Sequence, residues 1–254
     1  MACRYFMLLA YNGAPFHGWQ SQPNAASVQA AVEKAISTIL RQPVSVTGAG
    51  RTDTGVNARC MYAHFDVADP ITNTTSLCRS MNSLVGKDIA VYDIFSVADN
   101  AHARFDATSR TYKYFIGTRK SPFDYPFCWN PPYPLDVEIM NEATAYLKEY
   151  TDFTSFSKLH SDAKTNICRI DHAAWEQQGD KIVFTITADR FLRNMVRAIV
   201  GTLVEVGRHR IGIEEFCRII ERKDRCAAGI SVPGNALFLW SITYPYPVQR
   251  LILT

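Results

Sequence analysis

Strand-like and helical patterns alternate along this chain, and that alternation constrains the fold more than any other feature of the sequence. In the first half, the apolar run Tyr5–Tyr11 predicts a buried strand. Ser27–Leu40 has apolar residues at helical spacing, and Ser27 is the expected N-cap. The remaining elements predicted in this half are strands at Pro43–Thr47, Ala58–Val67 and Ile89–Val97 and a helix at Thr74–Leu84.

The second half repeats this alternation with different residues. An aromatic and proline-rich insertion, Pro122–Pro134, interrupts it. The predicted strands are Tyr112–Ile116, Ile167–Gln177, Lys181–Ala188 and Leu237–Thr243, and the predicted helices are Val137–Tyr150, Phe191–Val206 and Ile213–Glu221. We therefore expect an α+β protein of two lobes, residues 1–105 and 106–254, with mostly antiparallel mixed sheets flanked by helices and a cleft between the lobes.

Composition narrows the class of protein. The 254 residues are 47% hydrophobic, enough to bury a large core, and the formal net charge is only +3, so nucleic-acid binding would need a local basic face. Seven cysteines, an odd number without a Cys-x-x-Cys pair, argue against a disulfide framework or a cysteine zinc site. The six histidines are scattered without metal-ligand spacing, and no segment approaches the roughly 18 apolar residues of a membrane span. We expect a soluble cytoplasmic protein with no membrane partner.

The segment Gly50–Gly55 isolates one carboxylate, Asp53, between the cation of Arg51 and two glycines. A carboxylate held in this way is typical of a nucleophile that attacks a sugar carbon or a pyrimidine ring. The alternative is a tight surface turn in which Asp53 pairs with its neighbour Arg51. The segment alone leaves both interpretations open.

Three arginines surround the start of the predicted helix Phe191–Val206. Cations near a helix N-terminus cost roughly 0.3–1 kcal/mol each when they are exposed, so Arg190, Arg193 and Arg197 are placed at some cost in stability. Arg193 and Arg197 are four residues apart and are expected to share one helix face. Together they would form an anion site for a phosphate or for the Asp53 carboxylate. The alternative is a solvated helix face.

Cations and aromatic rings also alternate around the proposed lobe junction, in Arg104-Phe105 and in the run from Arg110 to Tyr114. This pattern is typical of RNA-binding surfaces, where arginine contacts phosphate and rings stack on bases. Aromatic residues at alternate strand positions are more often core residues, however. Tyr112 is the better candidate for the cleft, because its hydroxyl needs a partner if it is buried.

Four blocks of the sequence appear in the order that one known family shows. They are Gly50-Arg51-Thr52-Asp53-x-Gly55-Val56, Arg104-Phe105-x-Ala107-x-Ser109-Arg110-x-Tyr112, Asp152-Phe153-Thr154-Ser155-Phe156 and Phe191-Leu192-Arg193-x-Met195-Val196-Arg197. The segments His17–Gln20 and Leu237–Leu239 match the same family. Together these blocks resemble the tRNA pseudouridine synthase A family, and the resemblance covers nearly the whole chain.

This resemblance implies the pseudouridine synthase fold and an isomerase that converts uridine to pseudouridine in the anticodon stem-loop of tRNA, at tRNA positions 38 to 40. It implies tRNA as the partner, a homodimer, and no cofactor, because the reaction is redox-neutral. Asp53 would be the catalytic carboxylate, which either attacks C1′ or abstracts a ribose proton to form a glycal. Arg51 would keep Asp53 ionised and help fill the gap that the uridine leaves in its stack.

The resemblance also assigns roles in the second half of the chain. Tyr112 would stack on the flipped base and is a candidate for removing the proton from C5. Arg197 would approach the catalytic carboxylate, and Leu237 would pack against the uracil ring and help exclude water. Arg110 and Arg193 are the remaining predicted substrate contacts.

The sequence departs from the family pattern at several positions. Asn57 stands where the family usually has histidine, and an amide cannot carry a proton as imidazole can. Ala236 stands where glycine is common, and Leu84–Ile89 lacks the usual proline. Activity remains the expectation.

Two other classes of function fit parts of the sequence. A glycoside hydrolase would also use a nucleophilic aspartate, but it needs an acid partner roughly 5 to 9 Å away, and no nearby acid has a comparable setting. A non-catalytic RNA-binding protein would explain the basic and aromatic features equally well.

Overall fold

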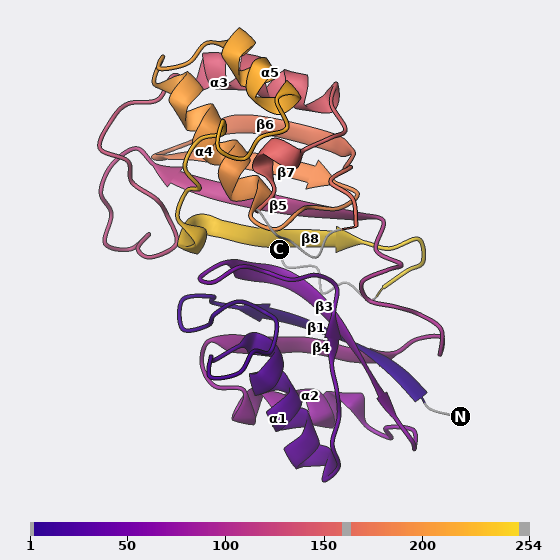
Figure 1. Cartoon of the computed structure of the whole chain (residues 1–254). Coiled ribbons are helices and arrows are strands. Elements are labelled where there is room, and N and C mark those ends of the chain that lie inside the picture. Colours follow the sequence, from indigo (N-terminus) through magenta and orange to yellow (C-terminus); the bar gives the residue numbers. More distant parts are fainter. Residues whose placement is uncertain (1–2, 159–163, 249–254) are drawn as a thin grey trace. The chain divides into compact units, whose positions relative to one another are not determined.

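The computed structural model describes residues 3–158 and 164–248 of the chain. The chain divides into two compact units (Figure 1): unit 1 holds the residues up to Thr108 and those from Leu239 onward, and unit 2 is Ser109–Phe238. The predicted lobe boundary lay between residues 105 and 106, and the segment from Leu239 was expected in the second lobe. That segment groups with unit 1, where Thr243 O accepts from Thr108 N at 2.8 Å and Tyr244 Oη donates to Ala103 O at 2.6 Å.

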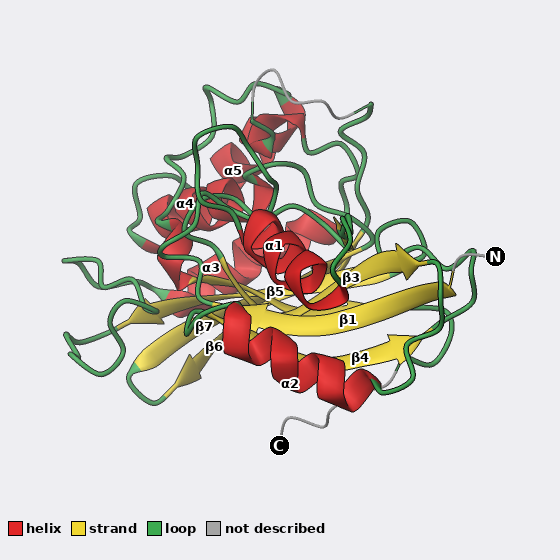
Figure 2. Ribbon diagram, turned by 90° about the horizontal axis from the view of Figure 1, so that it is seen from below, coloured by secondary structure: helices red, strands yellow, loops and turns green. Residues whose placement is uncertain are grey.

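Unit 1 is built on antiparallel strands β1 (Cys3–Tyr11), β3 (Asn57–Val67) and β4 (Ile89–Ser96), in the order β4-β1-β3. A two-residue strand, β2 (Thr47–Gly48), pairs with β3. Helices α1 (Val28–Leu40) and α2 (Thr74–Leu84) cover the same face of this sheet (Figure 2). The first half therefore folds into helices on a sheet, as its sequence pattern predicts.

The amphipathic pattern of the first helix is confirmed. Ser27 is the N-cap, and its hydroxyl accepts a hydrogen bond from Ala30 N at 3.2 Å. Val28, Val32 and Ile36 recur every four residues and are fully buried. Helix α1 thus presents one apolar face to the sheet of unit 1.

The strand predicted at Pro43–Thr47 is wrong except at its last residue. Val44 and Val46 are buried in the alternating manner that suggested a strand. Their backbone groups bind side chains of helix α1 instead of a neighbouring strand: Val44 N donates to Ser37 Oγ at 2.9 Å and Val46 N to Glu33 Oε1 at 2.9 Å. Burial alternates here without a strand ladder because the helix supplies the partners.

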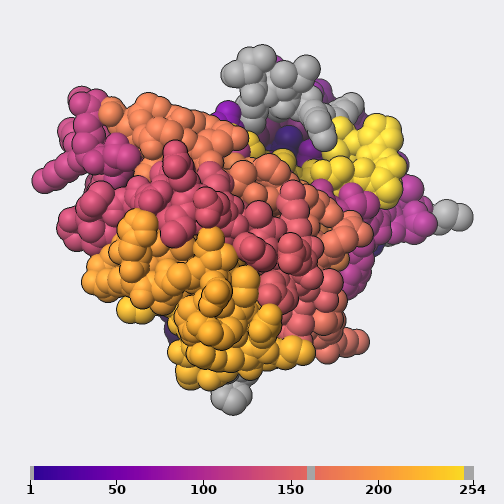
Figure 3. Space-filling view, turned by 90° about the horizontal axis from the view of Figure 1, so that it is seen from above, coloured from indigo at the N-terminus to yellow at the C-terminus, as the bar shows by residue number. Residues whose placement is uncertain are grey.

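Unit 2 contains antiparallel strands β5 (Ser109–Gly117), β6 (Ile170–Gln178) and β7 (Lys181–Ala188), in the order β5-β7-β6. Its helices are α3 (Val137–Ala145), α4 (Met195–Gly207) and α5 (Ile213–Glu221). Helix α3 packs against α4 and α5, and Figure 3 shows the rose-coloured surface of the α3 region beside orange surface from later in the chain. Short 3-10 turns occur at Tyr146–Lys148, Thr154–Phe156 and Gly234–Ala236. Strand β8 (Leu237–Thr243) begins in unit 2 and continues into unit 1.

Four elements of unit 2 start or end away from their predicted bounds. Strand β5 begins at Ser109 rather than Tyr112 and ends at Gly117 rather than Ile116. Helix α4 begins at Met195 rather than Phe191, because Asn194 adopts a left-handed conformation with φ of 67° that no helix can include. Helix α3 ends at Ala145 and continues only as a 3-10 turn. Strand β6 begins at Ile170, because Ile167 forms an isolated bridge with Asp152.

Within the described ranges, no helix combines the length and the apolar character needed to cross a membrane. All seven cysteines lie in these ranges, and none of them is paired in a disulfide.

Candidate active site

Asp53 lies on the irregular loop that connects β2 to β3 in unit 1. Its side chain is half-buried, while the preceding Thr52 is buried and Arg51 is exposed. Val56 N donates to Asp53 O at 3.1 Å and closes a turn. The tight turn expected from the glycines is therefore present, but its carboxylate is partly withdrawn from solvent.

Hydrogen bonds from two other segments fix this loop. Tyr11, at the end of β1, places its hydroxyl 2.9 Å from Thr52 Oγ1. Trp19 N donates to Thr52 O at 3.3 Å, and Gly55 N donates to Phe16 O at 3.3 Å. These bonds lie on both sides of Asp53, so the backbone that carries the carboxylate is restrained from both directions.

Two glycines allow the neighbouring loop to approach the Asp53 loop closely. Gly18 has φ of +91°, and a Cβ atom there would lie 2.3 Å from Thr52 O. A Cβ at Gly13 would lie 2.2 Å from Val56 O. Both distances are far below van der Waals contact, so only glycine fits at these positions.

Asn57, which stands where the family usually has histidine, has a structural role at the start of β3. Its side chain is 1% exposed, and its Oδ1 accepts a hydrogen bond from Gly13 N at 2.8 Å. This bond ties the start of β3 to the glycine-containing loop. The position needs a buried hydrogen-bond acceptor, and an amide oxygen supplies one.

Arg51 is positioned by a glutamine of the His17–Gln20 block. Its Nε donates to Gln20 Oε1 at 3.1 Å. This contact restrains the guanidinium at its Nε atom. The predicted charge pair between Arg51 and Asp53 stays a prediction.

In unit 2, Tyr112 lies on β5 and packs edge-on against Phe191, with ring centroids 5.1 Å apart. Tyr114 follows it on the same face of the strand and is fully buried, with its hydroxyl donating to Pro233 O at 3.1 Å. Burial raises the pKa of Tyr114 far above the ordinary value of a phenol, so this hydroxyl stays protonated. Tyr114 is therefore a core residue, and the proposed role of Tyr112 stays a prediction.

Arg197 and Leu237 lie on regular elements of the same unit. Arg197 is in the first turn of α4, and its Nε donates to Val232 O at 2.7 Å. Leu237 opens β8 and is 4% exposed. The segment before Leu237 is thus fastened to the helix that carries Arg197.

The predicted shared helix face of Arg193 and Arg197 is wrong, because α4 begins only at Met195 and Arg193 lies in the turn before it. Arg193 is exposed, and its carbonyl accepts from Lys158 N at 3.0 Å. Arg110 lies on β5 and donates through Nη1 to Asp189 O at 2.8 Å. Arg110 thereby braces the segment that leads into Phe191.

No group of three or more His, Cys, Asp or Glu side chains that could hold a metal ion occurs in the part of the chain that the structure describes.

Comparison with known proteins decides the family. Residues 148–245 match a family model described as tRNA pseudouridine synthase. The chain is 58% identical over 249 residues to tRNA pseudouridine synthase A of Parabacteroides distasonis, covering 97% of this chain and 99% of that protein. It is 56% identical to the Bacteroides thetaiotaomicron protein of that name (95% and 91% covered) and 39% identical to that of Thermoanaerobacter sp. (94% and 98% covered).

The chain belongs to the tRNA pseudouridine synthase A family. The α+β architecture with mostly antiparallel sheets and flanking helices agrees with the fold expected for that family. The blocks that carry the resemblance fall on the Asp53 loop, the approach to β5, the turn Thr154–Phe156 and the start of α4.

The residues that support these blocks carry no recognisable motif in the sequence. Tyr11 has the pattern of an ordinary strand residue, and Gly13 that of an ordinary loop glycine. In the structure, Tyr11 binds Thr52 and Gly13 binds Asn57, so both restrain the Asp53 loop. Gln29 was read only as part of a helix, although it binds Gln20 at 2.7 Å. These supports bind a loop far away in sequence, so local patterns could not reveal them.

Proposed function

We propose that this chain is a tRNA-uridine isomerase that converts uridine to pseudouridine in the anticodon stem-loop of tRNA. Its full-length similarity to proteins named tRNA pseudouridine synthase A carries the proposal. The restrained Asp53 loop supports it, because a nucleophile or base must be held in position before the substrate arrives.

Asp53 is the proposed catalytic carboxylate. The N1–C1′ bond of the target uridine breaks, the base turns, and C5 bonds to C1′; C5 then loses a proton and N1 gains one. The carboxylate acts either by attack on C1′ or by removal of a ribose proton. The uridine must leave its stack for either route, and Arg51 is suited to fill the gap that it leaves.

Residues of unit 2 supply the proposed contacts to the base. The Tyr112 ring stacks on the uracil, and its hydroxyl is a candidate for removal of the C5 proton. Leu237 presents an apolar side chain to the detached base, and excluding water there would prevent hydrolysis of the sugar intermediate. Arg197 supplies positive charge for the carboxylate, while Arg110 and Arg193 contact the RNA.

A homodimer in the cytoplasm is the proposed functional form. A tRNA is larger than one lobe of this protein, and two copies of a modest basic face would bind it more tightly without raising the net charge of each chain. Size-exclusion chromatography with mass measurement tests this: a monomer at assay concentration contradicts the dimer.

The decisive experiment identifies the product formed by the wild-type protein on an unmodified tRNA transcript. After digestion, chromatography should reveal pseudouridine and no released uracil. Released uracil would instead indicate a glycoside hydrolase. Tight tRNA binding without any product would indicate a non-catalytic RNA-binding protein, and either result overturns the proposal.

A further inference from the structure

Helix α1 supports the Asp53 loop through the backbone of the loop that precedes the helix. Gln29 lies in the first turn of α1, where backbone N–H groups have no partner within the helix. Gln29 N donates instead to Trp19 O at 3.0 Å. On the other side of the same residue, Trp19 N donates to Thr52 O at 3.3 Å. One residue of the preceding loop therefore links helix α1 to the residue next to Asp53.

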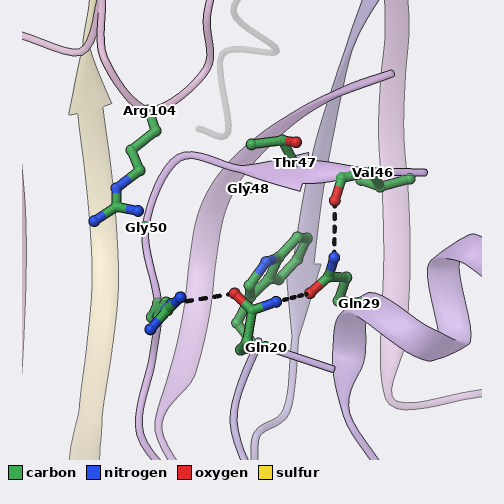
Figure 4. Close-up of a pocket in the computed structure, with 9 residues that line it drawn as sticks. Gln20, Gln29, Val46, Thr47, Gly48, Gly50 and Arg104 are labelled. Carbon is green, nitrogen blue, oxygen red and sulfur yellow. Dashed lines mark hydrogen bonds between the residues drawn. The ribbon is translucent and has the colours of Figure 1, made fainter. Parts of the chain in front are cut away.

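The side chain of Gln29 forms a second connection between the same segments. Its Nε2 donates to Val46 O and to Glu33 Oε1, both at 3.0 Å. Its Oε1 accepts from Gln20 Nε2 at 2.7 Å and from Ser21 N at 2.9 Å. Figure 4 shows Gln29 between Val46 and Gln20, with a hydrogen bond to each. The amide has two N–H donors and two oxygen lone pairs, so its hydrogen-bonding capacity is filled.

The partners of this amide allow only one orientation of it. Val46 O and the Glu33 carboxylate only accept hydrogen bonds, so the NH₂ group of the amide must face them. Ser21 N only donates, so the amide oxygen must face it. Gln20 therefore turns its own NH₂ group toward this oxygen, which leaves Gln20 Oε1 to accept from Arg51 Nε at 3.1 Å. Helix α1 thus determines that Arg51 meets an acceptor.

Arg51 lines a small pocket of unit 1 together with Gln20, Gln29 and Arg104. Its side chain is exposed, and a long arginine side chain loses much rotamer freedom when it is held in one position. The bond from Arg51 Nε to Gln20 already restrains the guanidinium, so less freedom remains to be lost on binding. Because a guanidinium is planar, a bond at Nε also limits where its two terminal nitrogens lie.

We propose that Gln29 and Gln20 are positioning residues for the isomerase reaction and that they act through Arg51. The inference rests on the proposed function, in which Arg51 fills the gap that the target uridine leaves in its stack. The chain from Gln29 through Gln20 holds the guanidinium in place for this step, so the uridine leaves its stack at a smaller entropic cost. Neither glutamine touches the reacting atoms in this account.

The first test measures how fast the Arg51 Nε–H exchanges with water, by ¹⁵N NMR of the arginine side chains. The resonance is assigned by its absence in Arg51→Lys. Loss of the bond to Gln20 should speed this exchange about ten-fold in Gln29→Leu and in Gln20→Met. Gln20→Met removes the acceptor directly and leaves helix α1 unchanged, so it also tests the proposal if Gln29→Leu folds poorly. Wild-type exchange in either folded variant overturns the proposal.

Asn82→Leu is the matched control. Asn82 is an amide of helix α2 in unit 1, and it binds Val91 N at 2.8 Å and Val91 O at 2.7 Å. Its loss should lower the thermal unfolding midpoint as Gln29→Leu does, because both changes leave backbone groups without a side-chain partner. Exchange at Arg51 and the rate of pseudouridine formation should stay at wild-type values. An equal change at Arg51 in Asn82→Leu would show general loosening of unit 1 and would overturn the proposal.

The second test is a double-mutant cycle on the single-turnover rate with tRNA. Gln29→Leu should lower the rate about ten-fold in the wild-type background and less than about two-fold in the Arg51→Lys background, where the Nε donor is absent. An equal loss in both backgrounds would show that Gln29 does not act through Arg51.

The proposed function fails separately from this inference. Absence of pseudouridine after reaction of wild type with tRNA would refute the isomerase, while the exchange measurement would still decide whether the two glutamines hold Arg51. Product from wild type with unchanged exchange in both glutamine variants would refute the positioning role alone.

Discussion

The predicted site residues of unit 1 and unit 2 are held by different kinds of scaffold. Asp53 lies on an irregular loop that other loops restrain through neutral hydrogen bonds and close glycine contacts. Tyr112 and Leu237 lie on strands and Arg197 on a helix, so regular elements set their backbones. In unit 1, substitution of a residue that supports the Asp53 loop should therefore lower the turnover rate. In unit 2, turnover should depend mainly on the side chains of the predicted site residues themselves.

Gly18→Ala should give the largest effect among the supporting positions. The new Cβ would lie 2.3 Å from Thr52 O at φ of +91°, so the Asp53 loop must move. We expect a loss of about 3 kcal/mol or more in unfolding free energy and about a hundred-fold loss in turnover on tRNA. Denaturant unfolding and initial rates of pseudouridine formation measure the two effects.

Gly179→Ala is the control for this substitution. Gly179 also has positive φ, +59°, but a Cβ there would meet open space in the β6–β7 turn. It should cost about 1–2 kcal/mol and leave turnover unchanged. Equal turnover losses in the two variants would contradict the claim that close packing at Gly18 positions Asp53.

Asn57→Ala should have the next largest effect. It removes the acceptor of Gly13 N at a site that is 1% exposed, which should cost about 1–3 kcal/mol and lower kcat about ten-fold. Asn141→Ala is matched to it, because Asn141 binds the backbone of Trp175 through Oδ1 and Nδ2 in unit 2. The two variants should lose similar amounts of stability. A similar drop in kcat for Asn141→Ala would contradict the claim that supporting residues affect turnover mainly in unit 1.

Tyr112→Ala tests the unit 2 side of the comparison. Loss of the ring should weaken tRNA binding by about 1–3 kcal/mol, the usual value of stacking on one base, and should raise KM. Tyr112→Phe keeps the ring and its edge-on contact with Phe191, so it should restore KM. If Tyr112→Phe restores KM but not kcat, the hydroxyl takes part in proton transfer. Failure of Phe to restore KM contradicts a stacking role.

The smallest effect concerns pH and the segment that carries Arg104. Burial, with Arg4 and His102 nearby, lowers the pKa of His64 to about 4, against the opposing influence of Asp66 and Asp106. The unfolded chain binds this proton near pH 6.5 and the folded chain only near pH 4, so the stability present at pH 7 declines as pH falls through this window. The decline should amount to about 1–2 kcal/mol between about pH 7 and about pH 5.

The check for this effect is denaturant unfolding of wild type and His64→Gln at the two pH values. Glutamine can accept the bond from Ala103 N without titrating, so the variant should lose less stability on acidification than wild type. Identical losses in both proteins would show that His64 does not bind the proton on unfolding.

Much of the fold could be predicted where local pattern and tertiary packing agree. The bounds of α2, α5 and β8 match their predictions, and Ser27 caps α1 as expected. Predictions failed where a distant residue supplies the backbone partner, as Glu33 does for Val46, or where one residue such as Asn194 leaves the helical region. Tertiary context overrode the local pattern in both cases.

The candidate site could likewise be predicted only where its residues are close in sequence. The glycines and the arginine around Asp53 lie within one run of six residues, so the sequence alone makes this carboxylate a candidate. The bond from Gly13 to Asn57 and the chain from Gln29 through Gln20 to Arg51 link residues that no short pattern joins. Arg104 was visible as part of an RNA-binding pattern, but its place in a pocket with Arg51 required the fold.

The most direct test of the central claim is the single-turnover rate of pseudouridine formation by Asp53→Asn, with enzyme saturating over tRNA. Asparagine keeps the size of the side chain and removes its charge and basicity, so stability and tRNA binding should match wild type. The account predicts a rate at least about a thousand-fold below that of wild type. A rate within a few-fold of wild type would contradict the assignment of Asp53 as the catalytic carboxylate.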